Sequence, residues 1–233
     1  MNAPTYHTRR GEIEAYFDRT AVEAWKRLTS DEPVGRIRST VRAGRNRMRD
    51  TLLSWLPDDL YGARILDAGC GTGALAVAAA RRGADVIAVD LSPNLVALAR
   101  ERAPRDLGRG SIEFCSGDML ATDLGTFDYI VGMDSLIHYT AKDAVGVLAG
   151  LAERARVSIL FTFAPRTAPL AVMHAVGRLF PRNNRAPAIE PIAIDKLHHL
   201  LSSNNSLKGW TPGRTALVAA GFYTSQALEL VRE

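Results

Sequence analysis

A run of glycines separates an apolar segment from a helical pattern near residue 70. Residues 64–68 predict a short buried strand, and residues 74–83 predict an amphipathic helix. Between them stand Gly69, Gly71 and Gly73. Glycine adopts positive φ and lets a ligand approach the main chain, because it has no Cβ. The first turn of a helix also presents N–H groups without helical partners. The pattern therefore predicts a site where main-chain donors hold a polar ligand.

Two acids flank this loop in the sequence. Asp67 precedes the first glycine by two positions, and Asp90 ends the next predicted strand, 85–90. An acid about 20 residues beyond the glycines is where a nucleotide ribose needs a hydroxyl acceptor. The glycine spacing is G-x-G-x-G, whereas dinucleotide sites use G-x-G-x-x-G. The Asp67 carboxylate would repel a diphosphate but attract an ammonium and a sulfonium. These residues favour a nucleoside cofactor that carries positive charge.

The segment 66–73, Leu-Asp-Ala-Gly-Cys-Gly-Thr-Gly, resembles the first motif of class I S-adenosylmethionine-dependent methyltransferases. The resemblance implies S-adenosylmethionine as cofactor and S-adenosylhomocysteine as product. Glycines alone could form a tight strand-to-helix turn without a ligand. The two acids, the strand and the helix together argue against that interpretation.

The alternation of strand and helix patterns predicts the fold. We expect an α/β, Rossmann-like class I methyltransferase: a seven-stranded, mostly parallel sheet with an antiparallel last strand, a helical N-terminal arm and an insertion after strand five. The predicted strands are 64–68, 85–90, 112–116, 127–133 and 157–162, followed by a hairpin of 207–218 and 222–232. The predicted helices of this part are 74–83, 92–103, 142–154 and 192–201.

The chain divides into two predicted parts. Residues 1–56 form a helical arm that caps the active site, with helices over 12–28 and 34–55. Residues 57–233 form the cofactor-binding domain, with a substrate flap at about 165–191 that contains five prolines. In the second arm helix, Ile37, Val41, Met48 and Leu52 share one face. Arg38, Arg42, Arg45 and Arg49 form a neighbouring stripe, which is either a solvated helix face or a clamp for carboxylates.

Ligands of such sheets bind at the carboxyl ends of the strands, so the residues there are the expected site. Strand three ends near Asp118 and Met119, which would hold an adenine by its amino group and its face. Strand four ends near Met133. The expected cofactor contacts are Asp67, Gly69, Cys70, Gly71, Gly73, Asp90, Leu91, Asp118, Met119 and Met133.

His138 follows strand four by a few residues and is the polar residue expected in the substrate pocket. An imidazole at that place can orient a nucleophile, take up a proton or ligate a metal in the substrate. His198 and His199 lie in a later helical pattern among leucines and are interpreted as a solvated helix face.

Composition narrows the classes of protein. The 233 residues carry a formal charge of +4, which suggests anionic partners. No apolar run approaches the 18 or so residues that span a bilayer, and residues 1–10 have no secretory h-region. We expect a cytoplasmic protein, with surface attachment to a membrane left open. Two cysteines exclude a disulfide framework or a multi-cysteine metal site, and no protein-bound metal is expected.

Several segments together resemble the magnesium-protoporphyrin IX O-methyltransferases of bacteriochlorophyll biosynthesis. The arm and Ile137-His138-Tyr139 are the family-specific parts. One departure is Leu28-Thr29-Ser30, where a tyrosine is expected in related enzymes; its role would be vacant here or pass to Tyr16 or Tyr139. The segments that carry the resemblance are 16–28, 37–49, 67–73, 134–139, 161–167 and 221–229.

The resemblance implies methyl transfer to one propionate of magnesium-protoporphyrin IX, which gives the monomethyl ester. It implies His138, Tyr16 and Tyr139 at the reacting end. Arginines would hold the substrate: Arg38, Arg42, Arg45 and Arg166. Further implied partners are a magnesium chelatase subunit and the surface of the photosynthetic membrane.

Three alternatives stay open at this point. A methyltransferase of another small acid or of a quinone would share the cofactor site but not the arm. A nucleic-acid methyltransferase would suit the basic arm, but the end of strand four lacks the Asn/Asp-Pro-Pro-Tyr segment used on flipped bases, and we expect no nucleic-acid partner. A porphyrin carrier or pathway scaffold would bind without turnover.

Overall fold

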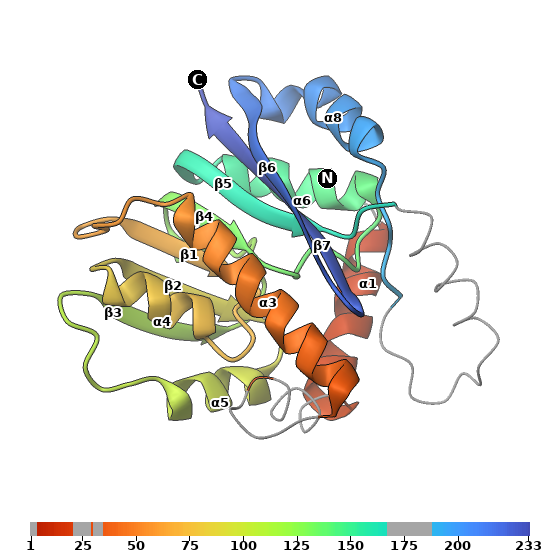
Figure 1. The fold of residues 1–233 in the computed structure, drawn as a ribbon. Coiled ribbons are helices and arrows are strands. Elements are labelled where there is room, and N and C mark those ends of the chain that lie inside the picture. Colours follow the sequence, from red (N-terminus) through yellow and green to blue (C-terminus); the bar gives the residue numbers. More distant parts are fainter. Residues whose placement is uncertain (1–3, 21–28, 30–34, 167–187) are drawn as a thin grey trace.

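The computed structural model describes residues 4–20, 29, 35–166 and 188–233. Its described residues form one seven-stranded sheet with the order β3-β2-β1-β4-β5-β7-β6 (Figure 1). The strands are β1 (Arg64–Ala68), β2 (Asp85–Asp90), β3 (Ser111–Ser116), β4 (Phe127–Gly132), β5 (Ala155–Phe163), β6 (Trp210–Ala220) and β7 (Tyr223–Arg232).

Strand directions follow the predicted pattern. β1 to β5 pair in parallel, whereas β7 runs antiparallel to both β5 and β6. The prediction of a mostly parallel sheet with an antiparallel last strand is confirmed. The order reverses between β1 and β4, so the carboxyl ends of these strands border the crevice where ligands of such sheets bind.

Helices cover both faces of the sheet (Figure 1). α3 (Arg36–Ser54), α4 (Ala74–Arg81) and α5 (Pro93–Arg102) pack on one face, and α1 (Pro4–Ala15), α6 (Ala141–Ala152) and α8 (Ile194–Ser203) on the other. Successive residues of a strand point to opposite faces of the sheet. In β1, Ile65 packs on the face covered by α3, α4 and α5, and Leu66 packs on the face covered by α1, α6 and α8. As predicted, Ser92 caps α5, with Pro93 at its first position.

The arm differs from its prediction at both helices. The first helix begins at Pro4, rather than at residue 12; proline is common at the first helical position, because its fixed φ suits a helix. It passes into a π-helical turn, Tyr16–Thr20, and residues 21–28 of the predicted helix lie outside the described residues. In α3, Met48 and Leu52 are fully buried, whereas Ile37 is 58% exposed and does not share their buried face. No described helix combines the length and apolarity that a membrane span requires.

The predicted flap begins and ends at one place in the fold. Pro165, just after β5, forms a parallel bridge with Ile192, and Arg166 N donates to Ile192 O at 3.0 Å. Residues 167–187 of the predicted flap lie outside the described residues. The two ends of this segment therefore meet beside the carboxyl end of β5.

Candidate active site

The glycine loop between β1 and α4 lies close to its neighbours. Gly69, Gly71 and Gly73 have φ values of 86°, 53° and 78°. A Cβ at Gly69 would come within 2.4 Å of the Ser135 Cβ, and one at Gly73 within 2.8 Å of the Phe114 ring. The loop therefore requires glycine for its backbone conformation and, at two positions, for space.

Two carboxylates hold this loop and the helix start behind it: Asp67 is buried, and Asp90 is partly buried. Asp90 accepts from Gly71 N at 2.8 Å and from Ser92 N at 3.0 Å. Asp67, only 1% exposed, accepts from Ala76 N in the first turn of α4 at 3.1 Å. Each carboxylate oxygen can accept a further hydrogen bond, so these contacts leave capacity for a ligand.

Burial changes the protonation of both acids. It raises the pKa of Asp67 to about 7, helped by the charge of Asp90 and opposed by the bond from Ala76 N. Burial also raises the pKa of Asp90, although the bonds from Ser92 N and Gly71 N oppose it. A cation placed beside Asp67 would favour its ionised form.

A cavity of about 230 Å³ lies between the glycine loop and α3. One side carries guanidinium groups, and the other carries the buried Asp67 carboxylate and residues of the glycine loop. These groups fit the amino-acid end of S-adenosylmethionine, which has a carboxylate and an ammonium. Sequence analysis did not single out Thr72 or Asn46. The lining residues are Thr29, Arg42, Arg45, Asn46, Arg49, Asp67, Gly69, Cys70, Thr72, Ala74, Leu75 and Met133.

The arm reaches the acid after β3. Asp118 accepts from Tyr6 OH at 2.8 Å, from Arg10 at 2.6 Å and from Leu120 N at 2.9 Å. Burial raises the pKa of Asp118, but these three donors outweigh it, and the pKa lies below its usual value. Met119 is buried. The sequence analysis missed Tyr6 and Arg10, because it began the arm helix after them; Pro4 was the available signal.

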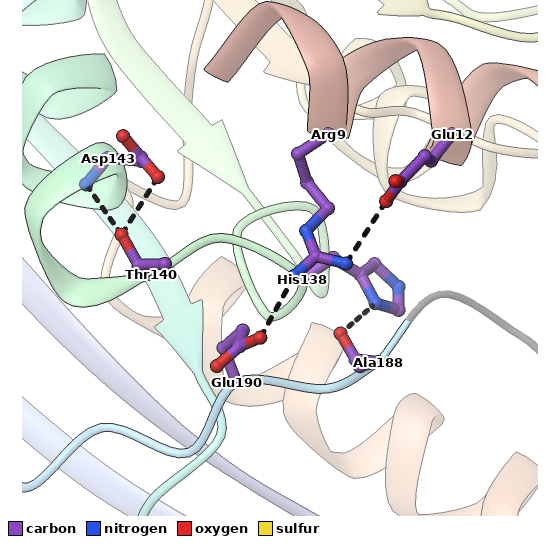
Figure 2. Close-up of polar contacts among 7 residues, drawn as sticks. All are labelled: Arg9, Glu12, His138, Thr140, Asp143, Ala188 and Glu190. Carbon is purple, nitrogen blue, oxygen red and sulfur yellow. Dashed lines mark hydrogen bonds and ion pairs between the residues drawn. The ribbon is translucent and has the colours of Figure 1, made fainter. Parts of the chain in front are cut away.

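His138 lies in the loop after β4, against Ala188 near the end of the predicted flap, 165–191 (Figure 2). It is 7% exposed, and its Nδ1 lies 3.3 Å from Ala188 O. A carbonyl only accepts, so this contact places the hydrogen on Nδ1. Figure 2 also shows Arg9 of α1 extending to Glu190, an ion pair of 3.0 Å.

Both predicted tyrosines contact aromatic residues of the arm. Tyr139 is buried and stacks on Tyr6 of α1, with ring centres 5.3 Å apart. Burial raises the pKa of the Tyr139 phenol, which therefore stays protonated. Tyr16 is partly buried and meets Phe17 edge-on, and the Phe17 ring lies 5.8 Å from that of His138. Each of the three predicted catalytic residues thus contacts an aromatic ring of the arm, Tyr6 or Phe17.

The four arginines of the predicted clamp do not all line the cavity. Arg42 and Arg45 line the cavity, and Arg45 forms an ion pair of 2.6 Å with Asp134. Arg38 is exposed on the first turn of α3, and Arg166 is exposed just after β5, near the start of the predicted flap. Among the described residues, no group of three or more His, Cys, Asp or Glu could hold a metal ion.

Comparison with known proteins finds methyltransferases that are similar to this chain. A family profile described as "Magnesium-protoporphyrin IX methyltransferase C-terminus" matches residues 132–232, and a methyltransferase-domain profile matches residues 65–157. The magnesium-protoporphyrin O-methyltransferase of Rhodobacter capsulatus is 51% identical over 221 residues, which cover 94% of this chain and 95% of the relative. The enzyme of that name from Synechocystis is 31% identical over 222 residues, with the same coverage.

A solved structure shares the fold. The crystal structure of magnesium protoporphyrin IX methyltransferase from Synechocystis with bound S-adenosylhomocysteine superposes with a TM-score of 0.82 at 30% identity. The match covers 95% of this chain and 98% of that one. With the identities above, it follows that this chain belongs to the magnesium-protoporphyrin O-methyltransferase family.

Proposed function

We propose that this chain transfers a methyl group from S-adenosylmethionine to a propionate carboxylate of magnesium-protoporphyrin IX, giving the monomethyl ester and S-adenosylhomocysteine. The observation that carries the proposal is similarity to magnesium-protoporphyrin O-methyltransferases over 94% of the chain, arm included. The alternatives of a different small acid or a quinone do not account for a similarity that includes the arm. The pathway is bacteriochlorophyll or chlorophyll biosynthesis.

The cofactor would bind along the carboxyl ends of β1 to β4. Asp90 would accept from the ribose hydroxyls, and Asp118 with Met119 would hold the adenine. The loop of Gly69, Cys70, Gly71 and Gly73, together with Asp67, would face the charged amino-acid end. Leu91 and Met133 would supply apolar contacts. When bound, the cofactor supplies an electrophilic methyl group on a sulfonium.

The acceptor needs little activation. A propionate with a carboxyl pKa of about 4 to 5 is ionised at neutral pH, so no general base must remove a proton. The protein has to hold one carboxylate oxygen in line with the methyl group and remove its water. An arginine bound tightly to the reacting carboxylate would lower its nucleophilicity. Arg38, Arg42, Arg45 and Arg166 would therefore steer the porphyrin and hold a carboxylate that does not react, such as the second propionate.

The His138 contact bears on its role. With the hydrogen on Nδ1, the Nε2 of a neutral imidazole is an acceptor, which can ligate the substrate magnesium but cannot donate to a carboxylate. A protonated imidazole could donate from Nε2 to a carboxylate. The Nδ1 contact with Ala188 O therefore supports ligation of the substrate magnesium by a neutral His138 over donation to a carboxylate. Tyr139 and Tyr16 would supply hydroxyl donors to the reacting end.

Peripheral membrane attachment and transfer from a magnesium chelatase subunit are further parts of this proposal. Exposed apolar side chains lie on α3 and on the hairpin of β6 and β7: Ile37 is 58% exposed, and Leu217 and Phe222 are each 56% exposed. Arg36 and Arg38 flank Ile37 and would meet anionic headgroups. Sedimentation with vesicles of anionic or neutral lipid would test attachment, and co-purification would test chelatase binding.

The first test is a chromatographic assay of purified protein with S-adenosylmethionine and magnesium-protoporphyrin IX. Metal-free and zinc porphyrins serve as comparators. A monomethyl ester is the expected product, and ligation by His138 predicts a lower KM for the metalloporphyrins than for the metal-free compound. Absence of ester from all three porphyrins, with S-adenosylhomocysteine still bound in a separate titration, would contradict the proposed substrate.

A further inference from the structure

Asp134, directly after Met133 in the loop that follows β4, has an unusual backbone. It has φ of 56°, and no other described residue except glycine has a positive φ. Side-chain-bearing residues seldom adopt this conformation, and aspartate and asparagine are the least disfavoured. Such a conformation persists only where surrounding contacts hold it, so it directs attention to the side chain.

The Asp134 carboxylate is surrounded by donors from two strands, β5 and β7, and from the helix α3. Its Oδ1 accepts from Tyr223 OH at 3.0 Å and from Ser225 Oγ at 3.1 Å, both on β7. Thr162 of β5 accepts from Asp134 N at 2.7 Å and donates to Oδ1 at 3.2 Å. The side chain is only 6% exposed. These hydroxyls fix the carboxylate without neutralising its charge.

The counter-charge comes from α3. The Arg45 guanidinium reaches Asp134 Oδ2 at 2.6 Å, and Arg45 is 21% exposed. Gly44, directly before Arg45, lets α3 lie close to β7. A Cβ at Gly44 would lie 2.4 Å from the Tyr223 ring, so the helix packs directly on that ring. Arg45 therefore stands at the wall of the cavity in a position determined by β5 and β7.

This arrangement has a consequence for binding. Arg45 shares the cavity with Arg42, Arg49 and the glycine loop. A guanidinium that is already fixed binds a carboxylate more tightly, because little side-chain freedom is lost on binding.

We propose that Asp134 is a positioning residue that sets Arg45 in the cavity, and that Arg45 there binds a ligand carboxylate. The ligand class rests on the proposed function: it is the amino-acid carboxylate of the cofactor or a propionate of the porphyrin. Asp134 acts through Arg45 and does not itself contact the ligand.

The test compares D134N, R45M and the double variant by titration. Asparagine tolerates the same backbone conformation but presents an amide to Arg45 in place of a charge. The probes are S-adenosylhomocysteine, methylthioadenosine, which lacks the amino-acid end, and magnesium-protoporphyrin followed by absorbance. R47M is the matched control, since Arg47 is exposed on the same helix and outside the cavity lining.

If the cofactor supplies the carboxylate, each single variant raises the Kd of S-adenosylhomocysteine about tenfold and changes that of methylthioadenosine less than about twofold. If the porphyrin supplies it, only the porphyrin Kd rises. In both cases the double variant binds no worse than R45M, because Asp134 acts through Arg45. None of these titrations requires turnover, so failure of the proposed reaction leaves them interpretable.

Three results would overturn the inference. D134N could leave all three affinities unchanged while R45M changes one. The two single effects could multiply in the double variant, which would show independent roles. S-adenosylhomocysteine and methylthioadenosine could weaken equally, which would indicate general damage to the fold. If D134N does not fold, R45M and R45K decide: rescue by lysine supports a charge contact, and wild-type affinity in R45M contradicts it.

Discussion

The cofactor side and the arm side of this molecule are assembled in different ways. At the cofactor side, Asp67 bonds Ala76 nine residues away, and Asp90 bonds Gly71 nineteen residues away. At the arm side, Tyr6 reaches Asp118 across 112 positions, and Arg9 reaches Glu190 across 181. The glycine loop is thus held within a single β-α-β unit, whereas the contacts of the arm, including the one to the proposed adenine acceptor Asp118, form only when distant segments meet.

The bonds also differ in kind. Hydrogen bonds from main-chain N–H groups to carboxylates held away from solvent are costly to break. Each group left without its partner has already lost its water. The pair of Arg9 and Glu190 has side chains that are 25% and 36% exposed, and such pairs contribute little. We infer a fixed frame around the cofactor and an adjustable wall around the substrate.

The sharpest test of this division is His138→Ala. We expect kcat for magnesium-protoporphyrin to fall about 100-fold, the scale of losing a group that acts on the reacting centre. The Kd of S-adenosylhomocysteine should change less than about twofold, because the histidine contacts belong to the arm side. Steady-state kinetics and calorimetric titration measure the two quantities.

The matched control is His199→Ala, since His199 is exposed on α8. An unaltered rate in His138→Ala would remove both the carboxylate-orienting and the metal-ligating role. A parallel loss of cofactor affinity would show that the two sides are one unit.

The reverse experiment uses Asp90→Ala. We expect cofactor affinity to fall tenfold or more, about 1.4 kcal/mol, because Asp90 both holds Gly71 and is the expected ribose acceptor. Porphyrin affinity should stay within about twofold of the wild type. Asp85→Ala, at the exposed amino end of the same strand, is the control. Wild-type cofactor affinity in Asp90→Ala would contradict the assigned pose.

The same division explains what could be predicted from the sequence. The sheet, its order of elements and the glycine loop follow from local patterns: periodicity, glycines, and a serine with proline that begins α5. Asp67 and Asp90 were recognisable because their partners lie within one strand-helix-strand unit. Short-range contacts leave a trace in residue spacing.

Residue spacing did not predict the contacts of the arm side. Nothing in the spacing of Tyr6 and Asp118 indicates that they meet. The contact depends on how α1 packs against the sheet. The arginine stripe likewise looked uniform, yet Arg45 is paired with Asp134 while Arg38 is exposed. Helical spacing predicts a face but not which neighbour occupies it.

A smaller effect should come from Asp67 and pH. With a pKa of about 7 in the protein without ligand, Asp67 holds a proton below that pH, and the cofactor ammonium favours its loss. Affinity for S-adenosylhomocysteine should therefore rise between pH 6 and 8, by at most about tenfold for one proton. Titration in buffers of different ionisation enthalpy would detect the released proton.

The stability of the folded protein should change with pH in the opposite direction to cofactor affinity. Because the folded pKa is raised above the usual value, the folded state keeps a proton that the unfolded state loses. The stability of the ligand-free protein should then fall as pH rises from about 4 to 7, and Asp67→Asn should flatten this dependence. Identical pH profiles for Asp67→Asn and the wild type, in both binding and melting, would contradict the raised pKa.

The smallest effect should come from Arg9→Met, which breaks the ion pair with Glu190 beside His138. Since both partners are partly exposed, we expect kcat/KM for the porphyrin to fall only about two- to threefold, with cofactor affinity unchanged. The difference from wild type should shrink at high salt, where a screened pair contributes less. Arg105→Met, an exposed arginine of the loop after α5, controls for the loss of one positive charge. A loss as large as that of His138→Ala would show that the arm is held as rigidly as the cofactor loop, because only a fixed contact transmits so large an effect from a partly exposed pair.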